Sequence, residues 1–334
     1  MKIVVDGYGG DNAPYEIVKG AVQAVNQDKD LEVIITGNEE ALKHIIAEFY
    51  SGARITIVDA PEVITCEEVP TIAIRRKKNS SLVKALTILK EKDVDGFVSA
   101  GSTGAVLAGG IFTLGRLNGV KRPALAPVLP TMKGGNVMLI DCGANIECKV
   151  EHLVQFAIMG ICYMQAVYAI ANPKVGLLSN GAENEKGSDL IRTTNSSLRA
   201  MDINFAGNVE ARDIVSGDYD VIVADGFNGN IALKSAEGTA NMVFAALKEE
   251  IGKSFKAKIG ALLMKSSFKA LKKRLDYTEY GGAAFLGVLK PLIKTHGSTK
   301  AKSIAASILQ AKKMAESGIT AKLDKQLKKY FGNE

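Results

Sequence analysis

Residues 95–110, DGFVSAGSTGAVLAGG, contain the pattern that decides the fold of this chain. The apolar run DGFVS is typical of a buried strand, and a turn of small residues joins it to a segment that fits a helix. Such a turn is often an anion-binding device, because free backbone N–H groups and the helix N-terminus both face the ligand. The stretch therefore predicts a strand–turn–helix unit whose turn holds an anion.

The same alternation continues on both sides of this unit. Helix-length segments such as YEIVKGAVQAVNQ (15–27) and EHLVQFAIMGICYMQAVYA (151–169) have apolar residues at intervals of three and four. Continuous apolar strands between such helices predict an α/β fold, an α/β/α sandwich with a mainly parallel sheet. We expect residues 1–334 to form a single unit, since no repeat or Pro-rich linker divides them. The predicted strands are 2–6, 32–36, 54–59, 96–100, 137–141, 174–179 and 221–225.

The composition narrows the classes of function. The chain has 334 residues, of which 47% are hydrophobic, so it can bury a large core. It begins with MKIVVDGYGGD, without a signal peptide's apolar region, and we find no apolar run long enough to span a bilayer, so we expect a cytoplasmic protein. The four cysteines form no disulfide or zinc pattern, and we expect them to be reduced and mostly buried, with no bound metal.

Small and polar residues follow five of the predicted strands. The carboxyl ends of parallel strands converge on one crevice, so these loops are expected to share a site. One such loop alone would be an ordinary turn, whereas five together favour ligand binding. The loops are DGYGGDNAP (6–14), AGSTGA (100–105), DCGAN (141–145), SNGAENEKG (179–187) and DGFNGN (225–230).

The loop 100–105 favours a small anion over a nucleotide. It lacks the lysine of the GxxxxGK[ST] motif and does not fit GxGxxG. Ser102 and Thr103 offer two hydroxyls and adjacent N–H groups to an oxyanion, although capping of the following helix would also explain them.

Three other loops carry candidate side chains. Lys186 can neutralise phosphate or polarise a carbonyl, or else it is a solvated loop lysine. Asn228 and Asn230 flank a glycine that permits close approach of a ligand, with an ordinary turn as the alternative. His296 can donate to an anion or be structural. No Ser-His-Asp or Cys-His arrangement stands out, so positioning and charge stabilisation fit better than a covalent acyl-enzyme.

An amphipathic basic segment is expected at about 240–275. From 251 to 275 there are seven lysines and one arginine without an acid, a charge of +8 in a chain of net charge +6. Gly260 and the KSS at 265–267 allow a break, which predicts two helices meeting at an apolar tip near GALLM (260–264). Such a segment packs on its own protein or a dimer partner, or it contacts an anionic membrane or an acidic protein. Nucleic acid is not expected, because the segment has no Tyr or Trp and belongs to no known nucleic-acid module. The candidate contact residues are Lys253, Lys256, Lys258, Leu262, Leu263, Lys265, Lys269, Lys272, Lys273 and Arg274.

Taken together, these loops resemble the phosphate acyltransferase (PlsX) family of bacterial phospholipid synthesis, which converts acyl-carrier-protein thioesters and inorganic phosphate into acyl phosphates. The order and number of the motifs make the resemblance specific along nearly the whole chain. The matching motifs are DGYGGDNAP (6–14), SAGSTGA (99–105), KRPALAPVLP (121–130), DCGANIECKVEHLVQFAIMG (141–160), NGAENEKG (180–187), FAGNVEARDI (205–214), DGFNGNIALKSAEG (225–238), YGGAAFLG (280–287) and HGS (296–298).

This resemblance implies a fold similar to isopropylmalate dehydrogenases and phosphotransacetylases, a homodimer, no cofactor and peripheral association with the cytoplasmic membrane. It also accounts for the basic segment, since acyl carrier protein is acidic and the product passes to a membrane-bound glycerol-3-phosphate acyltransferase. The positions expected to bind phosphate or substrate are Asp6, Gly9, Gly10, Gly101, Ser102, Thr103, Gly104, Asn145, Asn180, Asp225, Asn228, His296 and Ser298.

The mechanism expected from these residues is direct attack of phosphate on the thioester carbonyl. The 101–104 turn, with Asn145 or His296, would hold phosphate, while Lys186 and Asn230 stabilise the oxyanion. Two alternatives stay open: a phosphotransacetylase-like enzyme that uses acyl-coenzyme A, and a non-catalytic adaptor for a membrane or carrier protein. A metal-dependent dehydrogenase is a rival at the level of fold, but neither a nucleotide site nor an aspartate cluster can be assigned.

Overall fold

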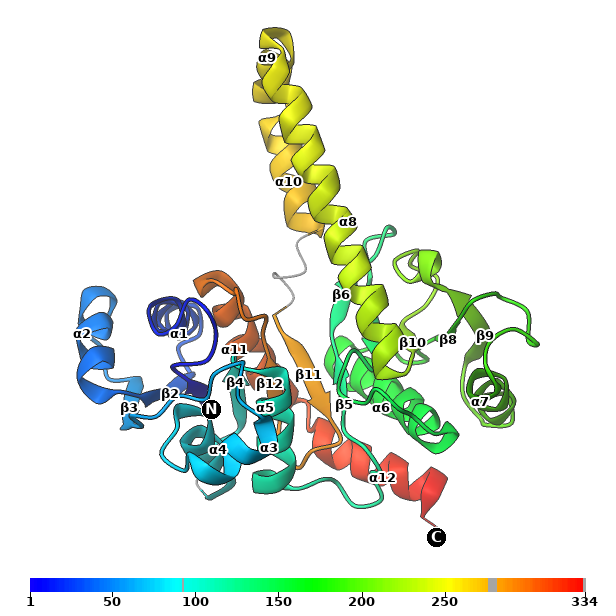
Figure 1. Cartoon of the computed structure of the whole chain (residues 1–334), viewed down its shortest axis with the longest axis horizontal. Helices are drawn as coiled ribbons and strands as arrows, with labels where there is room; N and C mark the ends of the chain where they lie inside the picture. Colours follow the sequence, from blue (N-terminus) through cyan, green and yellow to red (C-terminus); the bar gives the residue numbers. More distant parts are fainter. Residues whose placement is uncertain (92, 276–280, 333–334) are drawn as a thin grey trace.

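The strands form two sheets, not one (Figure 1). The computed structural model describes residues 1–91, 93–275 and 281–332, without the side chains of 272–275. Within these ranges the first sheet has seven strands in the order β3-β2-β1-β4-β12-β11-β5, and the second has five in the order β6-β7-β10-β8-β9. The bounds are β1 Lys2–Asp6, β2 Glu32–Gly37, β3 Ile55–Asp59, β4 Gly96–Ser99, β5 Ala124–Ala126, β6 Val128–Pro130, β7 Asn136–Ile140, β8 Val175–Ser179, β9 Phe205–Glu210, β10 Val221–Val223, β11 Ala283–Leu286 and β12 Leu292–Lys294.

Both sheets are mainly parallel, which confirms the predicted α/β class. Strands β1, β2, β3, β4 and β12 pair in parallel, as do β7, β10, β8 and β9. Antiparallel pairing occurs at β11 and at β6. Pro127 separates β5 from β6, and the chain passes there from one sheet to the other. Proline has no N–H to donate to a ladder, so it suits a point where one sheet ends.

Helices cover the sheets, and one group of helices projects away from them (Figure 1). The helix α1 packs on α11 beside the first sheet, and α6 packs on α7 and α12 beside the second. The bounds are α1 Tyr15–Gln27, α2 Glu39–Phe49, α3 Pro70–Arg76, α4 Ser81–Glu91, α5 Thr103–Gly109, α6 Val150–Tyr168, α7 Asp189–Arg199, α8 Gly226–Lys253, α9 Phe255–Leu263, α10 Lys265–Leu275, α11 Ala301–Glu316 and α12 Ile319–Phe331, with a π-helical turn at Gly110–Leu114 and a 3₁₀ turn at Ala211–Asp213.

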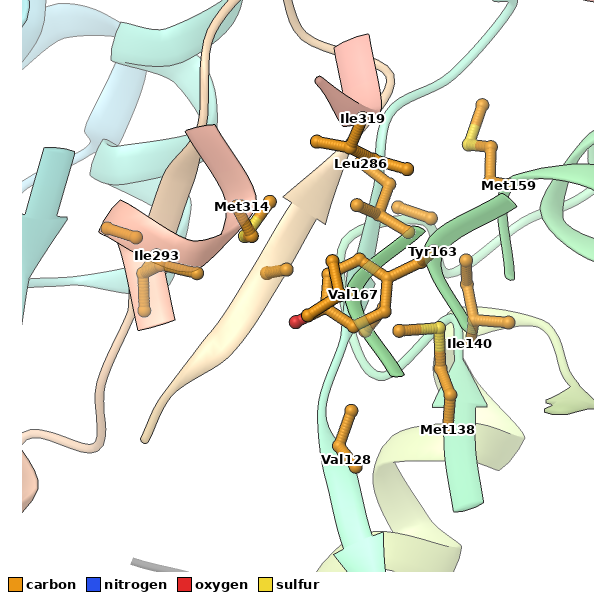
Figure 2. Packing of buried hydrophobic residues seen from close by; sticks show 14 of the residues in the cluster. Val128, Met138, Ile140, Met159, Tyr163, Val167, Leu286, Ile293, Met314 and Ile319 are labelled. Atoms are coloured by element: carbon orange, nitrogen blue, oxygen red, sulfur yellow. The ribbon is translucent and has the colours of Figure 1, made fainter. Parts of the chain in front are cut away.

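One hydrophobic cluster includes residues from both sheets (Figure 2). Leu286 of β11 and Ile140 of β7 belong to it, and Tyr163 of α6 lies between the elements that carry them. The Tyr163 ring is fully buried, and its hydroxyl accepts a hydrogen bond from Gln310 Nε2 of α11 at 3.1 Å. The polar tip of this aromatic side chain is thereby satisfied inside the core, as buried tyrosines require.

Helix α6 differs from the expectation that no apolar run could span a bilayer. By length and composition it is long enough to do so, but 72% of the stretch is buried inside the protein. It packs against β7, β10, α7, α11 and α12. Its apolar character is therefore explained by its place in the core.

The cysteines form no disulfide, and all of them lie within the described ranges. Cys142 and Cys162 are buried and Cys148 is half-buried, as expected, whereas Cys66 is exposed. Burial raises the pKa of Cys162 to about 12 and that of Cys148 to about 11, so both thiols stay protonated near neutral pH.

Helices α8, α9 and α10 form an arm that projects from the two sheets (Figure 1). The expected junction of two helices near 260–264 is present. Gly260 lies inside α9, and the chain turns at Met264, directly before the KSS at 265–267. A second break falls at Ser254, whose hydroxyl accepts from the Ala257 N–H at 3.4 Å and caps α9. Capping by serine ends one helix and starts the next, so the arm has three helices within the described residues.

Candidate active site

Loops that follow β1, β4 and β12 meet at one end of the first sheet. The Asp11 N–H donates to the Gly297 carbonyl at 2.9 Å, which ties the β1 loop to the β12 loop. A Cβ added at Gly9 would lie 2.7 Å from the Gly101 nitrogen, so only glycine allows the β1 and β4 loops to touch there. The structure thus brings together Gly9, Gly10 and Gly101, as the sequence predicted.

The buried carboxylate of Asp6 is connected to this cluster through hydrogen bonds of Ser99. Its carboxylate is 2% exposed, and Oδ2 accepts a hydrogen bond from Ser99 Oγ at 2.7 Å. Ser99 Oγ in turn accepts from the Gly101 N–H at 3.0 Å. Burial raises the pKa of the Asp6 carboxyl, and its Oδ1 has no hydrogen-bond partner among the described residues. Asp6 therefore positions the glycine turn through Ser99.

The loop after β7 is built on a second buried carboxylate, Asp141. Asp141 accepts from the backbone N–H groups of Leu125 at 2.8 Å and Asn145 at 2.7 Å. The Asn145 amide donates to the Pro123 carbonyl at 2.8 Å and to Asp141 Oδ2 at 2.9 Å. Both N–H groups of that amide are therefore engaged in holding the loop, and the expected contact of Asn145 with phosphate stays a prediction.

Asp225 caps the helix that carries the candidate asparagines. Its Oδ1 accepts from the backbone N–H of Asn228 at 2.9 Å, and its Oδ2 accepts from Asn228 Nδ2 at 2.6 Å. Capping by aspartate satisfies the first N–H groups of α8, and the negative charge of the carboxylate interacts favourably with the positive end of the helix dipole. Asp225 and Asn228 thus fix where the helix begins.

The start of α8 lies directly on the loop after β7. A Cβ added at Gly229 would lie 1.9 Å from the Asp141 carbonyl oxygen, so this approach requires glycine. It places Asn230 beside Gly143, where an added Cβ would be 3.6 Å from the Asn230 side-chain amide carbon. The helix therefore presents the Asn230 amide at the carboxyl end of β7.

A cavity of about 240 Å³ is lined by residues of both sheets and of α8. It brings together Thr103, Asn230 and His296, which come from three of the loops singled out in the sequence. It also contains polar side chains that sequence reasoning did not select: Lys234, Glu237 and Lys294. This is the crevice at the carboxyl ends of strands where α/β proteins bind ligands.

Lys294 is the functional candidate that sequence reasoning missed. It is the last residue of β12 and is 8% exposed. Its Nζ donates to the carbonyl oxygens of Ala100, at 3.4 Å, and of Thr295. Burial lowers its pKa to about 8. The available signal was a lysine at the end of the apolar run PLIK (291–294), in a segment not predicted to be a strand.

His296 lies on the loop that follows Lys294. Its Nδ1 is 2.8 Å from Ser298 Oγ, and burial lowers its pKa, which favours the neutral ring. On α8, which also lines the cavity, Lys234 Nζ pairs with Glu237 at 2.6 Å. The ammonium of Lys234 is thus already balanced by a carboxylate.

Several predicted residues are not among the described residues that line the cavity. Ser102 precedes α5, but within the described structure its hydroxyl makes no capping hydrogen bond, so capping does not account for it. Gly104 lies against Pro70 of α3. Asn180 and Lys186 are exposed on the loop after β8 and are not among the described residues that line the cavity. A catalytic role for Lys186 therefore stays a prediction.

The predicted contact residues of the arm are exposed wherever their side chains are described. Lys253 is paired with Glu249 at 2.9 Å and Glu250 at 2.7 Å, so its charge is balanced within α8. Leu262 and Leu263 are 69% and 80% exposed. The side chains of Lys272, Lys273 and Arg274 lie outside the described residues. In the part of the chain that is described, no group of three or more His, Cys, Asp or Glu residues could hold a metal ion.

The two mainly parallel sheets flanked by helices form a fold that is similar to that of phosphotransacetylases. A phosphotransacetylase from Streptococcus pyogenes has a TM-score of 0.62 at 17% identity, with 95% of this chain and 94% of that chain covered. A branched-chain phosphotransacylase from Enterococcus faecalis has a TM-score of 0.59 at 13% identity, covering 94% and 99%. At such identities the likeness concerns the fold alone.

The chain belongs to the fatty acid synthesis protein family, whose model matches residues 1–322. A phosphate acyltransferase of Clostridium novyi is 50% identical over 324 residues, 97% of each chain. A phosphate acyltransferase of Bacillus pumilus is 46% identical over 334 residues, 100% of each chain. The resemblance to the phosphate acyltransferases found in the loop motifs is confirmed, and the chain is a member of this transferase family.

Proposed function

We propose that this phosphate acyltransferase takes its acyl group from acyl carrier protein and forms an acyl phosphate for phospholipid synthesis. The family's description as fatty acid synthesis proteins supports a fatty acyl donor. The observation that carries the proposal is the cavity in which Lys294, Asn230 and His296 meet the Thr103 turn. Such a site offers hydrogen-bond donors and positive charge to a small oxyanion, and no nucleotide motif competes with that interpretation.

The reaction follows from these groups. A phosphate oxygen attacks the thioester carbonyl carbon, the carbonyl oxygen gains negative charge, and the C–S bond then breaks. The carrier leaves as a thiolate that takes a proton from solvent, so no acyl-enzyme forms. Phosphate is largely a dianion near neutral pH, and a strong general base is unnecessary. In this proposal the Asn230 amide donates to the oxyanion, and Lys186 is the second donor.

Trapping of the product tests this function. The full chain, inorganic phosphate, acyl carrier protein charged with a fatty acyl group, and hydroxylamine should give acyl hydroxamate in a phosphate-dependent manner. We expect Asn230→Ala and Lys186→Ala each to lower kcat about 100- to 1000-fold, the usual cost of removing an oxyanion donor. A folded variant with near-normal turnover would remove that residue from the mechanism.

The choice of thioester donor separates the alternatives. Product from acyl-coenzyme A but not from acyl carrier protein would favour a phosphotransacetylase-like activity. No phosphate-dependent product from either donor would favour a non-catalytic adaptor. The fold likeness to phosphotransacetylases does not decide between the donors, since it concerns architecture alone.

We further propose a cytoplasmic homodimer that contacts the cytoplasmic membrane peripherally through the tip of the arm. Two observations support this proposal. The tip exposes the apolar side chains of Phe255, Leu262 and Leu263, and the stretch 254–275 contains lysines but no Asp or Glu. Exposed Met242 and Val243 on α8 offer a surface to a second copy. The same basic surface suits an acidic carrier protein and delivery of product to a membrane glycerol-3-phosphate acyltransferase.

A further inference from the structure

We propose that Lys294 binds the phosphate substrate and so forms the floor of the anion site. The identity of the anion rests on the proposed function, whereas the presence of an anion site rests on the geometry around this side chain. Thr103 and Lys294 line the same cavity, and Lys294 Nζ contacts the carbonyl of Ala100, the residue before the glycine turn. An anion held by the turn would therefore meet the ammonium group.

The charge of Lys294 has no carboxylate partner within ion-pair distance among the described residues. Two other lysines show the usual arrangement, since Lys312 pairs with Asp28 and Lys234 pairs with Glu237. Burial of an uncompensated charge is costly, so a buried ammonium that faces a cavity calls for an anion inside that cavity.

The hydrogen bonds of Lys294 leave room for such an anion. An ammonium group has three N–H donors, and two acceptors are present, the carbonyl oxygens of Ala100 and Thr295. The two carbonyls orient the group without neutralising it. One donor thus stays available to the ligand, and a charge-assisted hydrogen bond to phosphate is stronger than one between neutral groups.

Asp6 does not remove this need for an anion. It lies under the same turn, but its Oδ2 accepts a hydrogen bond from Ser99 Oγ, and its carboxylate is not within ion-pair distance of Lys294 Nζ. Burial raises the pKa of Asp6. Burial also lowers the pKa of Lys294 to about 8, so the group is mostly charged at neutral pH and loses its charge above about pH 8. The charged or titratable groups that act on Lys294 are Cys66, Asp6, Lys234 and Asp11, and His296 and Glu237 share its cavity.

Direct binding of inorganic phosphate to the full chain tests the inference without any acyl donor. We expect phosphorus NMR titration to show a Kd about 10- to 100-fold higher for Lys294→Met than for the wild type. The matched control is Lys290→Met, which removes a lysine of the same hairpin whose Nζ donates to the Val94 carbonyl at 3.0 Å outside the cavity. In the acyl-transfer assay, Lys294→Met should raise KM for phosphate more than KM for the thioester.

Lys294→Arg provides a second test if the methionine variant fails to fold. Wild-type affinity for phosphate should fall as the pH rises above about 8, where Lys294 loses its proton, whereas arginine stays charged and should hold its affinity. Unchanged phosphate binding in folded Lys294→Met, or identical pH profiles for wild type and Lys294→Arg, would overturn the inference. If phosphate binding depends on Lys294 but no thioester gives acyl transfer, the inference stands and the proposed function is refuted.

Discussion

Two glycines of α8 show how single residues set the geometry of the site. Gly229 lies where a Cβ would be 1.9 Å from the Asp141 carbonyl oxygen, which is backbone and cannot move aside cheaply. Gly238, in the same helix, has nothing within 4 Å of an added Cβ. The two positions share a helix and a residue type, so their difference isolates the close contact.

We expect Gly229→Ala to destabilise the protein by about 1–3 kcal/mol, as overpacking does, and to impair acyl transfer by displacing Asn230. Gly238→Ala should stabilise it by about 0.5–1 kcal/mol, because alanine loses less backbone entropy in a helix. Denaturant unfolding and the hydroxamate assay measure both effects. Equal free energies of unfolding and equal activities of the two variants would mean that the close contact of Gly229 with Asp141 does not contribute to stability or activity.

Buried polar residues of the site divide into those that hold loops and those that face the cavity. Asp6, Asp141 and Asn145 are engaged in hydrogen bonds within the loops. Lys294 and Asn230 face the cavity. Sequence reasoning selected members of both groups, because loop-forming and ligand-binding residues share the same polar chemistry.

At the scale of elements, the arm differs most from the helices that cover the sheets, because its apolar side chains are exposed. Its tip exposes Leu262, Leu263 and Phe255, and the last of these is 78% exposed. Exposed apolar side chains beside lysines are typical of a surface that inserts into an anionic bilayer. Helix α9, which contains all three apolar residues and two lysines, lies at the end of the arm (Figure 1).

We expect the wild type to sediment with vesicles that contain phosphatidylglycerol. Leu262→Glu should bind them about tenfold more weakly, since it removes an exposed apolar side chain that the proposed membrane contact would bury and adds a negative charge. Leu289→Glu is the control, because Leu289 is 46% exposed on the body of the protein. Binding by Leu262→Glu equal to that of the wild type would refute a role for the tip.

Sedimentation equilibrium of the same proteins without vesicles checks their assembly state. A wild-type chain that is monomeric at all concentrations used would contradict the proposed homodimer. Wild type and both leucine variants should share one assembly state, so that a difference in vesicle binding is due to the tip.

At the scale of the whole molecule, one hydrophobic cluster links the two sheets. Leu286 of β11 is 1% exposed and belongs to the same cluster as Ile140 of β7. We expect Leu286→Ala to lower the free energy of unfolding by about 2–5 kcal/mol while unfolding stays a single transition. Leu289→Ala, at a 46% exposed position between β11 and β12, should change it by only about 0.5 kcal/mol or less.

Denaturant unfolding, followed by circular dichroism and by the exposure of buried tyrosine, measures the free energy of unfolding and the number of transitions. Two separate transitions would show that the sheets unfold independently and would contradict the prediction of a single unit over residues 1–334. Coincident transitions would support it, because a shared core makes loss of one sheet expose apolar surface of the other.

Much of the fold was predictable from local patterns. The strands at 2–6, 32–36 and 96–100 are continuous apolar runs, and their periodicity needs no tertiary information. The strands β5, β6, β9, β11 and β12 were not predicted. Four of these are only three or four residues long, and such runs occur equally within loops. The six-residue β9 has the sequence FAGNVE, in which small and polar residues interrupt the apolar pattern.

The sequence by itself determined the α/β class, the polar loops at the strand ends and the family, because periodicity and motif order are local properties of the chain. Tertiary structure alone decided that the strands divide into two sheets at Pro127 and that Lys294 enters the cavity beneath the glycine turn of residues 101–104. It also placed Lys186 on an exposed loop, and Lys186 is not among the described residues that line this cavity. The physical reason is that pairing and burial join residues far apart in the chain, so a lysine's role depends on which distant backbone carbonyls surround it.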